Sequence, residues 1–281
     1  MKILVTGANG LLGHDVVRQL TKDGHLTIGI DIAQVDITDT GAITRYIAGT
    51  QPDAVIHCAA YTAVDAAEDD QENCYNVNVF GTGNIAEICR KIDTKLMYIS
   101  TDYVFNGQGM LPWREDSNTE PINVYGATKL GGEIAVIKMV KKHYILRISW
   151  VFGLHGKNFV NTMIKLGRER DCVSVASDQV GSPTYTRDLA VLISSIVTTD
   201  KYGVYHATNE GYCSWYEFAV EIFKQTKIAV RVNEVESSLF TTKAKRPLNS
   251  RMDKSGLDIN GFDRLPLWQD ALRRYLHELD E

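Results

Sequence analysis

Lys2-Ile3-Leu4-Val5-Thr6-Gly7-Ala8-Asn9-Gly10-Leu11-Leu12-Gly13, at the start of the chain, is the stretch that decides the fold. Its apolar part predicts a strand over Ile3 to Thr6, and the residues from Leu11 to Leu20 have the periodicity of an amphipathic helix. Glycines between a strand and a helix allow a tight turn and bring backbone N–H groups close to a pyrophosphate at the positive helix N-terminus. The stretch therefore predicts a bound dinucleotide, with a purely structural turn as the alternative. We assign the pyrophosphate to Gly7, Gly10, Leu11, Leu12 and Gly13.

The first half of the chain continues this alternation of short apolar runs and helical segments. Further strands are predicted over Thr27 to Ile30, Ala54 to Cys58, Leu96 to Ser100 and Tyr144 to Ile148. Further helices are predicted over Asn84 to Ile92 and Ala127 to Met139. This order is typical of an α/β fold with a doubly wound parallel (Rossmann) sheet.

After Trp150 the alternation becomes less regular, and a polar loop is expected over Ser177 to Thr184. Helices are expected there over Arg187 to Ile196, Trp215 to Phe223 and Leu267 to Leu276. We therefore predict a dinucleotide-binding domain over 1–150 and a second, smaller α/β substrate domain mainly over 151–281. Segments of the second part can return to the first domain.

Composition restricts the class of protein. The 281 residues are 44% hydrophobic and 23% charged, enough apolar material for a full core. The net charge of −5 comes without a basic block, so we expect neither a nucleic acid nor an anionic membrane as partner. No apolar run reaches about 18 residues, and the N-terminus does not resemble a signal peptide, which favours a cytoplasmic protein.

The cysteines and histidines indicate neither disulfides nor a metal site. Five cysteines are an odd number without CxxC spacing, so we expect reduced thiols. His57 and His206 lack ligand spacing, and acidic residues such as Asp15 and Asp188 are more simply explained as solvated helix positions. We expect no metal site.

Asp31 ends the second predicted strand, where an acidic side chain usually reaches the adenosine ribose. A carboxylate there favours NAD over NADP because it repels a 2′-phosphate, whereas a strand-end turn is the alternative. Cationic residues elsewhere could still hold that phosphate, so the preference between NADH and NADPH stays open. Other residues at strand ends are expected along the adenine and nicotinamide sides, with ordinary loop packing as their alternative: Asp36, Ile37, Ala60, Tyr61 and Thr62.

Thr101, Tyr125 and Lys129 form the predicted reaction centre. Thr101 follows the fourth strand, and Tyr125 and Lys129 lie four residues apart on one face of the next helix. A nearby ammonium can lower the pKa of a phenol, which makes Tyr125 a proton donor. A ketone oxygen between Thr101 and Tyr125 could accept two hydrogen bonds while a hydride arrives from the nicotinamide, with Lys129 holding the ribose. A surface helix with a half-buried tyrosine is the alternative.

At this point the chain resembles the extended short-chain dehydrogenase/reductase superfamily, and within it the dTDP-4-dehydrorhamnose reductase family. Besides the glycine loop, the resemblance rests on four motifs: Ser100-Thr101-Asp102-Tyr103-Val104-Phe105, Tyr125-Gly126-Ala127-Thr128-Lys129-Leu130, Arg147-Ile148-Ser149-Trp150-Val151-Phe152-Gly153 and Asp178-Gln179-Val180-Gly181-Ser182-Pro183-Thr184.

The resemblance implies reduction of the C4 ketone of dTDP-4-dehydro-6-deoxy-L-mannose to dTDP-L-rhamnose, with NADH or NADPH and Tyr125 as the acid. It makes residues 151–281 mainly a nucleotide-sugar domain and the dTDP-sugar the partner. By the same resemblance, Thr101 and Asp102 contact the sugar and Trp150 packs on its face, a core tryptophan being the alternative. Gln179 and Arg246 would meet the nucleotide diphosphate, although Arg246 can equally be a solvated loop charge.

Other functions are compatible with these motifs. Related dehydratases carry Thr-Asp-Glu where this chain has Thr101-Asp102-Tyr103, which disfavours dehydration. A nucleotide-sugar 4-epimerase shares the tyrosine and lysine, and a non-catalytic regulatory subunit resembling that of methionine adenosyltransferase could keep the glycine loop. Gly131-Gly132 in a predicted helix indicates a close neighbour, either the helix's own sheet or the second subunit of a homodimer.

Overall fold

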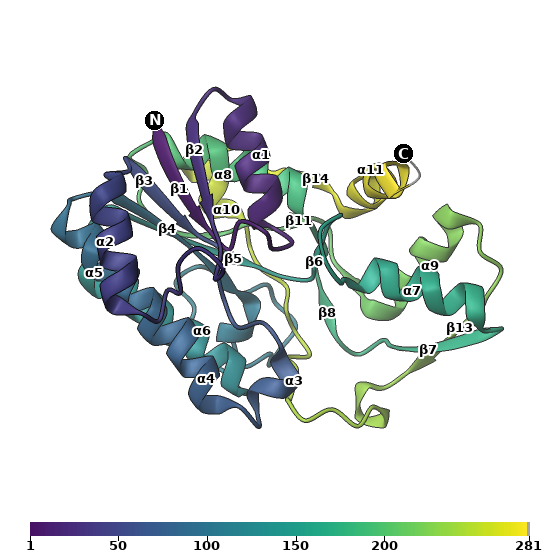
Figure 1. Ribbon diagram of the computed structural model, residues 1–281. Helices are drawn as coiled ribbons and strands as arrows, with labels where there is room; N and C mark the ends of the chain where they lie inside the picture. The colour runs from purple at the N-terminus through teal and green to yellow at the C-terminus, as the bar shows by residue number, and fades with distance from the viewer. Residues whose placement is uncertain (280–281) are drawn as a thin grey trace.

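A six-stranded parallel sheet forms the larger part of the computed structural model, which describes residues 1–279 (Figure 1). Its strands lie in the spatial order β10-β5-β4-β3-β1-β2. Their bounds are β1 (Lys2–Thr6), β2 (Leu26–Ile30), β3 (Ala54–His57), β4 (Lys95–Thr101), β5 (His143–Ile148) and β10 (Gly203–His206). The predicted α/β class with a doubly wound parallel sheet is confirmed.

Both faces of this sheet are buried, which explains the nearly continuous apolar strands. Ile3 and Val5 of β1 pack into one core cluster, whereas Leu4 between them packs into the other. The first cluster lies under α1 (Gly13–Lys22) and α8 (Thr186–Val197). The second lies under α2 (Thr40–Thr50), α5 (Thr82–Lys91) and α6 (Val124–Met139). The alternation of side chains along each strand therefore produces the two helical layers.

The order of the strands fixes the position of the ligand crevice. After β2 the chain crosses over β1, so that β1 pairs with β2 on one side and with β3 on the other. In open parallel sheets ligands bind beyond the carboxyl ends of the strands at such a switch point. Thr6 and His57 lie opposite each other there, with Thr6 Oγ1 2.7 Å from His57 Nδ1.

A smaller group of elements lies beside this sheet, on the right in Figure 1. Its strands form three pairs: β6 (Val151–Phe152) with β9 (Thr184–Tyr185), β7 (Cys172–Ala176) with β13 (Arg231–Val235), and β8 (Val180–Gly181) with β12 (Cys213–Ser214). Its helices are α7 (Phe159–Glu169), α9 (Trp215–Thr226) and α11 (Trp268–Leu279). A separate aromatic core that includes Phe152, Phe218 and Tyr275 holds them together. β8 lies within the segment expected as a polar loop, and β9 begins at the last residue of that segment.

Part of the chain after residue 150 belongs to the first sheet. β10 pairs with β5, and α8 packs on α1. The division of the chain into domains at residue 150 stays a prediction. The remaining short elements are α3 (Val64–Ala67), α4 (Gln71–Tyr75), a π-helical turn (Asn76–Gly81), 3-10 turns (Asp102–Val104 and Ser237–Leu239), β11 (Asn209–Glu210), α10 (Ser255–Ile259) and β14 (Leu265–Leu267).

The two glycines inside α6 face neighbours from the same chain. A Cβ on Gly132 would lie 2.3 Å from the Tyr98 hydroxyl oxygen, and one on Gly131 would lie 2.8 Å from Val79 Cγ2. The close approach is therefore explained by β4 and the π-helical turn, and a homodimer stays a prediction.

All five cysteines are free thiols, as expected. Within residues 1–279 no helix combines the length and the apolar character needed to cross a membrane.

Candidate active site

One cavity of about 1190 Å³ opens at the carboxyl ends of β1, β3 and β4. Almost all the residues predicted for the site line it: Gly7, Gly10, Leu11, Leu12, Gly13, Asp31, Asp36, Ile37, Ala60, Tyr61, Thr62, Thr101, Asp102, Tyr125, Lys129 and Trp150. Gln179 and Arg246 are not among its lining residues. The structure thus brings the predicted cofactor loop and the predicted reaction centre to one cavity.

The glycine loop has a shape that only glycine permits at two positions. Gly7 has a φ of +66°, and a Cβ on it would lie 2.7 Å from the Ala59 backbone nitrogen. A Cβ on Gly13 would lie 2.0 Å from the Gly7 carbonyl oxygen. α1 begins at Gly13, and no side chain caps it, so no side chain competes with an anion at this helix N-terminus. The loop therefore fits the pyrophosphate of a dinucleotide.

Asp31 lines the cavity and also makes local hydrogen bonds. Its carboxylate accepts hydrogen bonds from the backbone N–H of Asn9 at 3.0 Å and of Ile32 at 2.8 Å. Both readings of this residue, a turn and a ribose partner, are compatible with this geometry because a carboxylate has about four acceptor sites.

Asn78 is a residue that motif reasoning missed. It is buried in the π-helical turn, its amide oxygen accepts from the Tyr61 N–H at 2.9 Å, and its amide nitrogen donates to Thr128 Oγ1 at 3.0 Å. Asn78 therefore connects the loop after β3 to the start of α6. The π-helical turn is a feature often found near functional sites, but no spacing in the sequence indicates it.

The head of α6 lies against the turn that follows β4. Asn123 caps the helix by accepting from the Gly126 N–H at 2.7 Å, and a Cβ on Gly126 would lie 2.2 Å from the Tyr103 carbonyl oxygen. This approach puts the rings of Tyr125 and Tyr103 in edge contact, with centroids 5.8 Å apart. It also places Tyr125 close enough to Thr101 for the Thr101 side chain to act on the phenol.

The structure corrects one electrostatic expectation. Burial and the Asp102 carboxylate raise the pKa of Tyr125 above its ordinary value, and Thr101 offsets only part of this rise. Lys129 is not among the groups that shift the pKa of this phenol, so the prediction that its ammonium lowers this pKa is wrong. The Lys129 ammonium instead donates to the Ile99 carbonyl at 2.7 Å and lies 4.1 Å from the Tyr98 ring centroid. A raised pKa keeps Tyr125 protonated, which is the state that a proton donor needs.

Lys129 and Asp102 are both shifted toward their neutral forms by burial. Burial lowers the pKa of Lys129 to about 7, against the opposing effect of Glu133. Burial also raises the pKa of Asp102 to about 6, although Ser250 and a hydrogen bond from Thr101 favour its charged form. Titratable groups with such shifts inside a cavity are typical of active sites.

The low pKa of Lys129 predicts a pH-dependent effect on stability. Between about pH 7 and the ordinary lysine pKa of about 10.4, the unfolded chain binds a proton at Lys129 that the folded chain does not, so the free energy of unfolding rises with pH. We expect Lys129→Met to stabilise the protein relative to wild type most at pH 7 and below, with a gain that shrinks toward pH 10. Urea unfolding at several pH values measures this, with Lys165→Met as the control for loss of an exposed lysine. A gain that grows with pH would contradict the assignment.

Trp150 and Trp215 form an aromatic wall of the cavity. Their rings stack with centroids 3.6 Å apart at 12°, and both residues line the cavity. Trp150 has a φ of +49°, an unusual conformation for a bulky residue. The sequence did not indicate Trp215 as a site residue. It lies 65 positions after Trp150, at the start of α9, and no local motif surrounds it.

Arg246 and Gln179 lie outside the cavity lining. Arg246 forms a two-point ion pair with Asp65, at 2.6 Å between Nη2 and Oδ2 and 3.2 Å between Nη1 and Oδ1. It also interacts with Tyr103, which does line the cavity. Gln179 is buried beside β8. Their predicted contacts with a diphosphate stay predictions.

Comparisons with known proteins identify the family of the chain. The family model described as RmlD substrate binding domain matches residues 1–281. The chain is 38% identical to the spore coat polysaccharide biosynthesis protein SpsK of Bacillus subtilis, covering 99% of this chain and 97% of that protein. It is 37% identical to a dTDP-4-dehydrorhamnose reductase of Aggregatibacter actinomycetemcomitans, covering 97% of each. A crystal structure of dTDP-4-dehydrorhamnose reductase from Bacillus anthracis in complex with NADP is 41% identical, with a TM-score of 0.96 over 99% of both chains. The chain belongs to the RmlD substrate binding domain family.

Proposed function

We propose that this protein is an NAD(P)H-dependent reductase that converts the C4 ketone of dTDP-4-dehydro-6-deoxy-L-mannose to the alcohol of dTDP-L-rhamnose. The observation that carries the proposal is that Thr101, Tyr125 and the glycine loop line one cavity. Membership of the family and the relatives named as dTDP-4-dehydrorhamnose reductases support the choice of substrate.

In this proposal the chain acts on the ketone through two hydroxyl groups. A bound nicotinamide supplies the hydride that adds to the sugar C4. Thr101 and Tyr125 donate hydrogen bonds to the ketone oxygen, which gains the electron pair of the C=O bond. Tyr125 then gives its proton to this oxygen, and the product is the neutral alcohol. Lys129 holds the ribose and stabilises the phenolate left on Tyr125 once the dinucleotide has changed its surroundings.

The sugar would lie between the reaction centre and the aromatic wall of Trp150 and Trp215. Asp102 follows Thr101 and is buried with it, so its carboxyl can contact a sugar hydroxyl. The planar tryptophan pair offers an apolar face to the C–H groups of the ring. We keep Gln179 and Arg246 as proposed contacts of the dTDP diphosphate, which would require Arg246 to exchange Asp65 for phosphate.

The test follows nicotinamide oxidation by absorbance with purified protein and dTDP-4-dehydro-6-deoxy-L-mannose. A reductase consumes one NADH or NADPH per sugar reduced. An epimerase retains its cofactor and shows no net oxidation, and a regulatory subunit binds the dinucleotide without turnover. Absence of oxidation by the wild-type protein with either cofactor would contradict the proposal.

The cofactor preference depends in our proposal on Asp31. We expect Asp31→Asn to raise the ratio of kcat/KM for NADPH over NADH by about tenfold, equivalent to about 1.4 kcal/mol, because it removes a charge that repels a 2′-phosphate. Asparagine keeps an acceptor for the Asn9 N–H. Steady-state kinetics with both cofactors measure the ratio. Asp36→Asn, which neutralises another acidic residue of the cavity wall, is the control. An unchanged ratio in Asp31→Asn would remove Asp31 from cofactor choice.

A further inference from the structure

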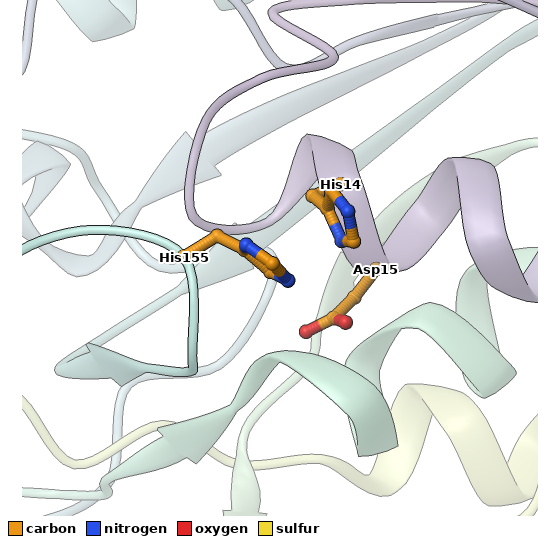
Figure 2. Close-up of side chains that lie close together, drawn as sticks. All are labelled: His14, Asp15 and His155. Carbon is orange, nitrogen blue, oxygen red and sulfur yellow. The ribbon is translucent and has the colours of Figure 1, made fainter. Parts of the chain in front are cut away.

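A short loop from the smaller part of the molecule lies beside the glycine loop. It covers residues 153–158, between β6 and α7, and we call it the β6–α7 loop. The ring of His155 in this loop faces the ring of His14 in the first turn of α1, with centroids 3.4 Å apart (Figure 2). A Cβ on Gly156 would lie 3.7 Å from Leu11 Cδ1. The tip of the β6–α7 loop is therefore next to the residues predicted to hold the pyrophosphate.

The base of the β6–α7 loop is held in place by buried contacts. Asn158 donates a hydrogen bond from Nδ2 to the Gly153 carbonyl at 2.8 Å, and its Oδ1 caps the first turn of α7. A Cβ on Gly153 would lie 2.1 Å from Thr186 Oγ1, so the backbone there packs directly against the start of α8. Lys157, at the tip, is exposed. The fold therefore fixes the position of the loop and leaves the side chain of this lysine mobile.

The cavity contains few positive charges for an anionic ligand. Three carboxylates line it, those of Asp31, Asp36 and Asp102. Among residues 1–279, Lys129 and Lys157 are the only lysines or arginines that line it. Lys129 is buried at the reaction centre, whereas the Lys157 ammonium has no hydrogen-bond or ion-pair partner within the same residues. Lys157 is therefore the unpaired positive charge at the end of the cavity that holds the glycine loop.

We propose that Lys157 binds the pyrophosphate of the dinucleotide, in addition to the glycine loop. This inference rests on the dinucleotide site of the proposed function. The N–H groups of the glycine loop are neutral donors, whereas the pyrophosphate is doubly negative and would enter a cavity that three carboxylates already line. An ammonium with three donors on a flexible four-carbon stem suits such a ligand. Because Lys157 belongs to the β6–α7 loop, it joins the smaller part of the molecule to the bound cofactor.

Two other phosphate groups belong to the same ligands, the 2′-phosphate of NADPH and the diphosphate of the dTDP-sugar. The 2′-phosphate is attached to the adenosine ribose, for which Asp31 at the end of β2 is the predicted partner. The proposed contacts of the dTDP diphosphate are Gln179 and Arg246, which do not line the cavity. The β6–α7 loop instead contacts the glycine loop and α1. These contacts favour the pyrophosphate of the dinucleotide as the partner of Lys157.

The test is calorimetric titration of the full chain with NADH, NADPH and dTDP, each alone. We expect Lys157→Gln to weaken the binding of both dinucleotides by about tenfold and by similar factors, because a charge-assisted hydrogen bond to a shared group is lost. Its affinity for dTDP should equal that of the wild-type protein. Lys157→Arg keeps the charge and should keep most of the affinity for the dinucleotides.

Lys165→Gln, which removes an exposed lysine of α7, is the matched control and should bind all three ligands as the wild-type protein does. Circular dichroism shows whether each variant is folded. Unchanged affinity of folded Lys157→Gln for both dinucleotides would overturn the proposal. A loss confined to NADPH would also overturn it, by assigning Lys157 to the 2′-phosphate, and so would a loss confined to dTDP.

Titration measures binding without turnover, which separates this proposal from the proposed reaction. A wild-type protein that binds the dinucleotides but oxidises neither with the sugar contradicts the reductase function. The expected loss of affinity in Lys157→Gln would then still support the contact between Lys157 and the pyrophosphate. If the wild-type protein binds neither dinucleotide, both proposals are wrong.

Discussion

Tyr125→Phe is expected to lower kcat by about 10²–10⁴-fold while leaving the affinity for the dinucleotide nearly unchanged. The substitution removes the hydroxyl that donates the proton, but it keeps the ring that packs against Tyr103. Steady-state kinetics measure kcat, and calorimetric titration with NADH or NADPH measures the affinity. A loss in kcat without a loss in cofactor affinity is the pattern of a group that acts in the transition state.

Tyr103 offers a matched control for this prediction. It lines the same cavity and contacts the Tyr125 ring edge-on, so Tyr103→Phe removes a phenolic hydroxyl from the neighbouring ring. We expect its kcat to fall far less than that of Tyr125→Phe. Equal losses in the two variants, or a Tyr125→Phe enzyme as active as wild type, would refute the assignment of Tyr125 as proton donor.

Gly13→Ala is expected to weaken dinucleotide binding by at least about 100-fold, which corresponds to about 2.7 kcal/mol. The added Cβ would lie 2.0 Å from the Gly7 carbonyl oxygen and 2.8 Å from the Gly7 carbonyl carbon. Both are backbone atoms, so the loop has to open and the N–H groups that would face the pyrophosphate move away. Calorimetric titration with NADH and NADPH measures the loss.

Gly10→Ala is a milder form of the same substitution in the same loop. Its Cβ would meet the same carbonyl oxygen at 3.2 Å, a contact that a small shift can relieve. We therefore expect a smaller loss of affinity than in Gly13→Ala. Urea unfolding of both variants shows whether each is folded. If folded Gly13→Ala binds the dinucleotide as tightly as wild type, the glycine loop is not the pyrophosphate site.

The main elements of the fold could be predicted because their signals are local. Buried parallel strands are apolar on both faces, so the predicted strand Ala54 to Cys58 differs from β3 (Ala54–His57) by one residue. The predicted helix Ala127 to Met139 lacks only the first turn of α6 (Val124–Met139). α2 (Thr40–Thr50) was not predicted, because only two of its side chains are buried and its apolar face is narrow.

The short strands of the smaller part were missed for a different reason. β8 (Val180–Gly181) and β9 (Thr184–Tyr185) contain two residues each, which is too short for a period of two to be recognised. Their pairing partners are β12 and β6, about 30 residues away along the chain. Such pairing depends on contacts between distant segments and leaves no pattern within either one.

The sequence alone determined the glycine loop, the common helix face of Tyr125 and Lys129, and the position of Thr101 after a strand. These features follow from backbone geometry over a few residues, which nearby side chains control. Only the tertiary structure decided what surrounds them. Burial lowers the pKa of Lys129, and it raises that of Tyr125, whereas the spacing of the two residues predicts a lower pKa for the phenol. The meeting of His14 with His155 is likewise tertiary, because the loop after β6 reaches the start of α1 only once both parts of the chain have folded.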